Sequence, residues 1–396
     1  MPSSILASPG ARGFEINRLG LNLLYLVPGE VGGSEVYARN LLRAISRARP
    51  ELELVAYVGR EALSSLAAEP WANRTRFVVS PAASRNKPLR VAGELTWLPA
   101  RARRDRVELL HSLGTTSPIV CPVPSVVSVL DVIYHHFPET FPAASRLGLR
   151  LVVPAGARRA RRVIAISEAG KRDIVSTLGL KPEKVDVVHL GFAMKDAAAP
   201  TPEPELRARF GLGQEAVLLT VAAALRHKNL FRLLEAFALL GTPDTRLVVV
   251  GHSGLDQERL RARARELGVD ERLHFTGWVD EADLEGLYSI ATAFVYPSLM
   301  EGFGMPVLEA MYRGVPVACS NVSAMPEVAG DAAELFDPTD PAAIAAALSR
   351  LLGDPVRREE LVVRGSERWK AFSWERAAEE TLAVYERALG ASSSWR

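Results

Sequence analysis

The sequence contains only two cysteines, Cys121 and Cys319, which lie far apart and follow no metal-binding spacing. No apolar run approaches the ~18 residues of a membrane-spanning helix, and the N-terminus lacks the charged-then-apolar pattern of a signal peptide. Isolated, reduced thiols are typical of cytoplasmic proteins. We therefore expect a cytoplasmic protein that is neither secreted nor membrane-spanning.

Several functional motifs are also missing. No Asp-x-Asp triplet occurs, so the sequence has no evident carboxylates for a metal ion, and no G-x-x-x-x-G-K-[S/T] loop occurs, which excludes the usual kinase or ATPase. The dinucleotide pattern G-x-G-x-x-G/A is matched only at 211–216, where it precedes a predicted strand instead of following one. The net charge of +2 provides no general attraction for nucleic acid. We expect no metal, no other cofactor and no nucleic-acid partner.

Arginines are nevertheless clustered in the first half of the chain, at 101–106 and again at 158–162. Such clusters are usually solvated helix faces. The alternative is a basic patch that makes peripheral contact with an anionic membrane, which would be the inner face of the cell membrane for a cytoplasmic protein.

Strand-like apolar runs alternate with helical patterns along most of the 396 residues, which predicts two domains of parallel α/β architecture. In the first half, a helix is predicted over 35–47, and the predicted strands are 21–27, 54–58, 107–111, 125–130, 163–166 and 185–189. Residues 192–205 are rich in Ala and Pro and predict a linker. In the second half, the predicted strands are 216–222, 246–250, 273–275, 291–296 and 315–319. The predicted helices are 229–240, 257–267, 280–290, 306–313, 340–352 and 374–389.

The most informative segment is 296–309, which follows the predicted buried strand 291–296. Pro306 stands where the next helix would begin, because proline suits the first helical position. The loop before it consists of Gly302, Phe303, Gly304 and Met305. Its amides and the helix N-terminus would suit a phosphate group. Because Glu301 and Glu309 flank this phosphate site, the segment predicts binding of a nucleotide sugar.

Other loops of the second half follow predicted strands, at the sheet edge where parallel sheets bind ligands. Arg226 and Lys228 would form only a surface turn in isolation, but beside the glycine loop they are cationic partners for a diphosphate. Gly251 would allow the backbone to approach a ligand closely. Trp278 and Val279 would frame a nucleobase, with core packing as the alternative for the indole.

The first half offers weaker candidates. Gly32 and Gly33 precede a helix and form a second candidate site for an anion or for close backbone approach. Asp131 follows a predicted strand and would face the same cleft as the candidate phosphate site. His135 and His136 are interpreted as ordinary loop residues.

These residues resemble glycosyltransferase family 4. The resemblance is most specific over 291–341, where Glu301 and Glu309 are similar to the E-x7-E signature of the family. Further similar segments are 314–317, 320–322, 326–328, 330–333, 166–168, 171–173 and the Gly32-Gly33 pair. The resemblance implies a retaining transferase of GT-B fold, with two Rossmann-like parallel-sheet domains facing across a cleft. The implied domains are 1–196 on the acceptor side and 197–371 on the nucleotide-sugar side, with the helix in 372–396 packing back on the first.

The resemblance also implies roles for individual residues. Glu301 would contact the donor sugar, Glu309 the ribose, and the amides of 302–305 the sugar and phosphate. Lys228 would neutralise the diphosphate together with Arg226, and Asp131 would complete the catalytic set. Two positions depart from the family pattern. Ala223 stands where many members have arginine, and Leu130 stands where many have a histidine before the aspartate.

The leading hypothesis is a metal-independent, retaining hexosyltransferase of polysaccharide biosynthesis. Mannose is favoured, from GDP-mannose, with UDP- or dTDP-hexoses as other donors and a glycan or lipid-linked molecule as acceptor. Leu130 and Ala223 support the alternative of a non-catalytic GT-B nucleotide-binding subunit of a glycosyltransferase assembly. A third hypothesis makes Glu301 and Glu309 the acid and base of a glycosidase. A helix N-terminus between the two carboxylates makes phosphate recognition the simpler account.

Overall fold

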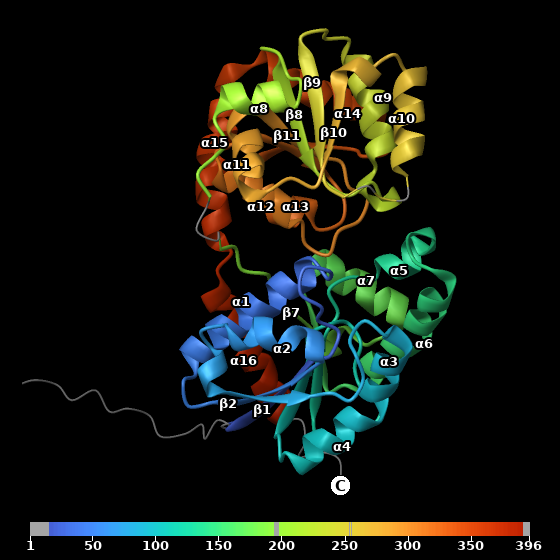
Figure 1. Cartoon of the computed structure of the whole chain (residues 1–396), viewed down its shortest axis with the longest axis vertical. Coiled ribbons are helices and arrows are strands. Elements are labelled where there is room, and N and C mark those ends of the chain that lie inside the picture. Colours follow the sequence, from blue (N-terminus) through green and yellow to red (C-terminus); the bar gives the residue numbers. More distant parts are fainter. Residues whose placement is uncertain (1–15, 194–197, 253, 255, 391–396) are drawn as a thin grey trace, which may run out of the picture. The chain divides into compact units, whose positions relative to one another are not determined.

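The computed structural model describes residues 16–193, 198–252, 254 and 256–390, and it contains two separate β-sheets (Figure 1). The first sheet has the strand order β3-β2-β1-β4-β5-β6-β7 and the second β10-β9-β8-β11-β12-β13. The strands of the first sheet are β1 (Arg18–Leu23), β2 (Glu53–Val58), β3 (Thr75–Val79), β4 (Leu109–Ser112), β5 (Ser125–Ser128), β6 (Arg162–Ala165) and β7 (Val185–Val187). Those of the second are β8 (Ala216–Val221), β9 (Thr245–Val250), β10 (Leu273–Gly277), β11 (Ala291–Tyr296), β12 (Val317–Ser320) and β13 (Ala333–Phe336).

Every pair of neighbouring strands from β3 to β6, and every pair in the second sheet, is parallel. The prediction of two parallel α/β sheets is therefore confirmed. In each sheet the strand order reverses once, between β1 and β4 and between β8 and β11. Loops at the carboxyl ends of strands beside such a reversal are where open parallel sheets bind ligands.

Helices connect the strands. In the first half of the chain they are α1 (Gly33–Ala48), α2 (Arg60–Ala67), α3 (Lys87–Leu95), α4 (Trp97–Arg104), α5 (Ile133–His136), α6 (Ala143–Arg159) and α7 (Glu168–Leu178). In the second half they are α8 (Glu203–Arg209), α9 (Leu230–Leu240), α10 (Gln257–Glu266), α11 (Glu281–Ile290), α12 (Met305–Tyr312), α13 (Met325–Ala329), α14 (Pro341–Gly353), α15 (Pro355–Arg368) and α16 (Trp374–Gly390). Within the described part of the chain, no helix is both long and apolar enough to cross a bilayer.

The central strands of the second sheet, such as β8, are buried on both faces. Val217 and Leu219 on β8 belong to one hydrophobic cluster, and Leu218 between them belongs to another. Successive side chains of a strand point to opposite faces, so both faces are covered by apolar side chains. This explains why these strands are near-continuous apolar runs in the sequence.

Contacts between Cα atoms divide the described residues into two compact units. The first consists of 16–129, 152–164 and 378–390, and the second consists of 130–151 and 165–377, apart from the undescribed positions. Within the first unit, Tyr385 on α16 is hydrogen-bonded to His111 on β4, with 2.7 Å between the phenol oxygen and Nδ1. The domain boundaries expected from the family, at 196–197 and 371–372, remain predictions.

Some local predictions were wrong. The first strand ends at Leu23 and does not reach 27, because the Asn22 side chain accepts a hydrogen bond from the Leu24 amide and turns the chain. The segment predicted as a linker, 192–205, contains the start of α8 at Glu203, and its residues 194–197 lie outside the described residues. Helix α6 was not predicted, since Gly and Pro154 interrupt its apolar pattern.

Candidate nucleotide-sugar site

The candidate site lies in the second unit, on the loops that follow β8 and β11. These strands are neighbours in the sheet although about 70 residues separate them in the sequence. Asn229, directly after Lys228, donates two hydrogen bonds from its side-chain amide, to the Pro297 carbonyl at 3.0 Å and to the Pro338 carbonyl at 2.7 Å. Because Asn229 is buried, these bonds fix the Lys228 loop to the loop that contains Glu301.

Lys228, Tyr296 and Glu301 form a compact polar group. The Lys228 ammonium lies 2.6 Å from a Glu301 carboxylate oxygen and donates to the Tyr296 hydroxyl at 2.9 Å. The hydroxyl in turn donates to the same Glu301 oxygen at 2.9 Å. Only 16% of the Lys228 side chain and 11% of the Glu301 side chain are exposed. The pair is therefore largely shielded from water.

Burial and charge act in opposite directions on this group. Burial alone would raise the pKa of Glu301, but the Lys228 ammonium outweighs it and holds that pKa below the ordinary value. Burial would lower the pKa of Lys228, while Glu301 and Tyr296 raise it above the ordinary value. Burial, followed by the charge of Glu301, raises the pKa of the Tyr296 phenol. At neutral pH the group is an ion pair with a neutral tyrosine.

The glycine loop leads directly into α12, which begins at Met305, one residue before the predicted start at Pro306. Gly304 has φ +107°, which favours glycine. A Cβ on Gly302 would lie 2.2 Å from the Leu130 carbonyl oxygen, so only glycine fits there. The Ser167 hydroxyl donates to the Gly302 carbonyl at 2.8 Å. Both close contacts involve residues of the second unit and define the path of the loop.

Ser323 holds the start of this loop from the other side. The Glu301 amide donates to the Ser323 hydroxyl at 3.1 Å, and that hydroxyl donates back to the Glu301 carbonyl at 2.9 Å. Phe303, by contrast, has a buried side chain whose ring packs edge-on against Phe372. Its side chain belongs to the core, so only the backbone of Phe303 is available to a ligand.

Glu309 lies in the second turn of α12, in a polar cluster of its own. Its carboxylate accepts a hydrogen bond from the Tyr288 hydroxyl at 3.5 Å. Burial raises the pKa of Glu309, and the nearby Arg313 guanidinium acts against that shift. Arg313 is itself hydrogen-bonded to Glu285 on α11. The structure thus places the two signature glutamates in different electrostatic surroundings.

The remaining predicted residues have surroundings of their own. Arg226 is 47% exposed and its Nε lies 3.8 Å from Asp256, so it is directed to a carboxylate other than Glu301. Asp131 accepts a hydrogen bond from the Ile133 amide at 3.0 Å, and burial raises its pKa, with a further increase from the Glu301 charge. Gly32 and Gly33 belong to the first unit and begin α1.

The candidate base site contains an exposed indole. Trp278 is 75% exposed and stacks on His252, with ring centroids 4.9 Å apart and planes inclined by 24°. Core packing of Trp278 is thereby excluded, whereas Val279 packs against the core. A Cβ on Gly251 would lie 2.6 Å from the Ala222 carbonyl oxygen, so the β9 loop approaches the end of β8 closely.

Sequence reasoning missed Tyr296, Ser323 and Tyr288. Tyr296 carries a signal that could have been used, because a tyrosine at the end of a buried strand needs a partner for its hydroxyl. Ser323 and Tyr288 reach the two glutamates only through the tertiary fold. No cluster of three or more His, Cys, Asp or Glu side chains suited to a metal ion occurs among the residues that the structure describes.

The architecture is the GT-B fold of glycosyltransferases. Anabaena Alr3699/HepE, solved in complex with UDP and glucose, matches with a TM-score of 0.70 at 20% identity, over 94% of this chain and 99% of that one. Residues 31–194 match the family model described as Glycosyltransferase Family 4, and residues 202–368 match the one described as Glycosyl transferases group 1.

Two curated relatives extend the comparison. D-inositol 3-phosphate glycosyltransferase 1 of Catenulispora acidiphila is 30% identical over 76% of this chain and 71% of its own length. The O-antigen chain mannosyltransferase B of Escherichia coli is 33% identical over 57% of this chain, and the match spans only 60% of that relative. The chain belongs to glycosyltransferase family 4.

Proposed function

We propose that the protein is a retaining glycosyltransferase that moves a hexose from a nucleotide-diphosphate sugar to a glycan or lipid-linked acceptor. The observation that carries this proposal is the buried Lys228–Glu301 pair at the entrance to α12. Separating a buried ion pair is costly unless both charges find new partners. A nucleotide sugar offers both, because its diphosphate suits the lysine and its sugar hydroxyls suit the carboxylate.

The proposed chemistry follows from this exchange of partners. Lys228 and the first amides of α12 stabilise the diphosphate as it departs, and Arg226 adds a second cation after leaving Asp256. Glu301 holds the donor sugar and Glu309 the ribose. The departing phosphate takes the acceptor proton in a front-face attack, which retains configuration, and we assign Asp131 a role toward the acceptor. No metal ion is needed in this scheme, so activity in excess EDTA should equal activity without it.

We propose mannose as the transferred sugar and GDP-mannose as the first donor to test. The mannosyltransferase relative supports this choice, and the UDP-bound neighbour makes UDP-hexoses the next candidates. Calorimetric titration with GDP-mannose, UDP-glucose and a dTDP-hexose tests donor binding. Binding weaker than millimolar for all three would overturn the proposal.

Turnover separates an enzyme from a non-catalytic subunit. Donor hydrolysis and transfer by the wild type are compared with those of the Glu301→Ala variant. Equal, background-level rates in both proteins would assign the chain to the non-catalytic subunit instead.

We further propose peripheral contact with an anionic membrane at its cytoplasmic face. Arg103 and Arg104 on α4 are exposed, whereas Arg101 beside them is hydrogen-bonded to Asp105 at 2.9 Å and is partly structural. Sedimentation with anionic vesicles at low and high salt tests this contact. Binding that is absent, or equal at both salt concentrations, would contradict it.

A further inference from the structure

The glycine loop of the first unit, residues 29–33, is held by hydrogen bonds instead of by packing. Gly29 has φ +76° and Gly32 has φ +55°, and both are exposed. A Cβ built on Gly29, Gly32 or Gly33 would meet no other described atom within 4 Å. The surface of this loop is therefore open, and its conformation depends on a few polar contacts.

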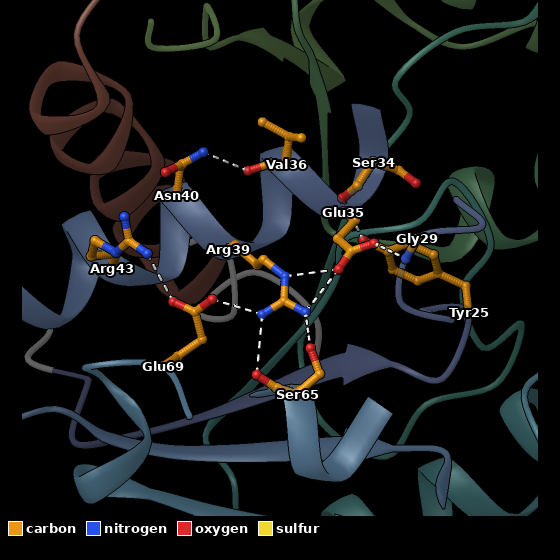
Figure 2. Close-up of polar contacts among 10 residues, drawn as sticks. All are labelled: Tyr25, Gly29, Ser34, Glu35, Val36, Arg39, Asn40, Arg43, Ser65 and Glu69. Carbon is orange, nitrogen blue, oxygen red and sulfur yellow. Dashed lines mark hydrogen bonds and ion pairs between the residues drawn. The ribbon is translucent and has the colours of Figure 1, made fainter. Parts of the chain in front are cut away.

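Glu35, in the first turn of α1, makes the contact that reaches furthest back into the loop. One of its carboxylate oxygens accepts a hydrogen bond from the Gly29 amide at 2.8 Å (Figure 2). Gly29 lies three residues before Gly32, the N-terminal cap of α1. A glutamate near a helix N-terminus commonly bonds the capping residue itself. Glu35 thus orders more of the preceding chain than a helix cap requires.

Arg39 fixes the other oxygen of Glu35. Figure 2 shows the Arg39 guanidinium between Glu35 on one side and Glu69 on the other, with 2.9 Å to Glu35 and 2.6 Å to Glu69. It also donates to the Ser65 hydroxyl on α2 at 2.5 Å. Glu69 is shared with Arg43 at 3.0 Å. All three guanidinium nitrogens are engaged, so Arg39 has little freedom to turn.

The network joins α1 to the α2 region at one end and holds the glycine loop at the other. Bonds from Arg39 to Ser65 and Glu69 are sufficient to join α1 to the α2 region, which is a purely structural task. The bond from Glu35 to Gly29 adds nothing to that junction and acts only on the open loop. A bare carboxylate here would also repel an anion near the first amides of α1. The Arg39 guanidinium offsets that charge.

We propose that Glu35 and Arg39 are positioning residues for the glycine loop on the acceptor side of the reaction. Arg39 fixes the Glu35 carboxylate and offsets its charge, and Glu35 fixes the Gly29 amide. The loop then presents its open surface to the acceptor. The acceptor role rests on the proposed function, whereas the ordering of the loop does not.

Hydrogen exchange tests the ordering directly. Peptides covering 26–34 are followed in the wild type and in Glu35→Ala, Glu35→Gln and Asn40→Ala. Asn40 is a matched control, because it lies on the same helix but its side chain points away from Arg39, and it bonds only the Val36 carbonyl among the described contacts (Figure 2). We expect at least tenfold faster exchange at Gly29 in Glu35→Ala. A smaller increase is expected in Glu35→Gln, which keeps an acceptor oxygen, and none in Asn40→Ala.

Kinetics test the role in transfer. Misplacing a substrate-holding group by about 1 Å costs roughly a hundredfold in rate. Glu35→Ala and Arg39→Lys should therefore lose about 10- to 100-fold in kcat/KM for the acceptor, while the donor Kd stays within about twofold. Thermal melting identifies a variant that fails to fold, and if Glu35→Ala does so, Arg39→Lys decides.

The outcomes separate the two proposals. Unchanged exchange at Gly29 in Glu35→Ala overturns the positioning role whatever the activity. Changed exchange with an unchanged acceptor kcat/KM overturns the acceptor role. If the wild type transfers no sugar at all, the proposed function fails, and the exchange measurement alone decides whether Glu35 orders the loop.

Discussion

Replacing Lys228 by methionine is the sharpest test of the ion pair at the candidate site. The variant keeps most of the side-chain volume but leaves the Glu301 carboxylate buried without its cation. Breaking a buried pair by removing one partner costs about 3–5 kcal/mol. Because 16% and 11% of the two side chains remain exposed, we expect the lower end of that range. For a unit of this size, about 3 kcal/mol corresponds to a decrease of roughly 6–12 °C in melting temperature.

The matched control is Lys370→Met. Lys370 also lies 2.6 Å from a carboxylate oxygen, that of Glu367, but these side chains are 52% and 73% exposed. An exposed pair contributes about 0–1 kcal/mol, so the control should melt within about 4 °C of the wild type. The double variant Lys228→Met with Glu301→Gln removes the unpaired charge and should recover most of the lost stability.

The effect of pH gives an independent check. In the wild type the pKa of Glu301 is lowered, so its contribution to stability is present above the unfolded value of about 4.3 and is lost as the pH falls through the folded value. In Lys228→Met, the main influence that opposes burial is gone, so burial raises the pKa of Glu301 and the variant gains stability as the pH falls. The difference from the wild type should be larger at pH 8 than at pH 5. Equal melting temperatures of variant and wild type at pH 8 would refute the reasoning.

Three further predictions concern neighbouring residues. Tyr296→Phe removes a hydroxyl that is hydrogen-bonded to both charges of the pair, and it should lower the free energy of unfolding by about 1–3 kcal/mol. Urea denaturation measures this loss, and an unchanged midpoint would contradict the hydrogen-bonded group. Gly251→Ala should lower the free energy of unfolding by about 1–3 kcal/mol, which is more than Gly241→Ala, whose added methyl meets nothing within 4 Å. Equal urea denaturation midpoints of these two variants would contradict this prediction. Trp278→Ala should leave stability within about 0.5 kcal/mol of the wild type, because the indole is 75% exposed. If that indole stacks on the donor base, calorimetry should show donor affinity at least about fivefold weaker, and equal affinity would remove Trp278 from the base site.

The parallel α/β class was predictable because it depends on local patterns. Apolar runs of strand length alternated with amphipathic segments, and the structure confirmed both sheets. Individual boundaries were less predictable. The first strand ended early because Asn22 bonded the following backbone, and side chain to backbone contacts of this kind are not visible in an apolar pattern.

The placement of charges was decided by the tertiary structure. The sequence put Arg226 and Lys228 in one loop with equal roles, yet Lys228 lies against Glu301 while Arg226 lies near Asp256. A short turn directs neighbouring side chains to different sides, and the burial of each depends on segments far away in the chain. The same holds for Trp278. The sequence allowed either base contact or core packing for its indole, and the structure shows that the indole is exposed.

The sequence by itself determined that the site lies at the edge of a parallel sheet where the strands have their carboxyl ends. Loops after parallel strands share one edge of a sheet, so the loops of Lys228 and Glu301 had to lie on the same side. Only the tertiary structure decided that these loops touch. Contact required β8 and β11 to be neighbours in the sheet, and an alternation of strands and helices along the chain is compatible with several strand orders. It also required Asn229 to join the two loops and Tyr296 to bridge the pair, because a buried charge is stable only where specific partners surround it.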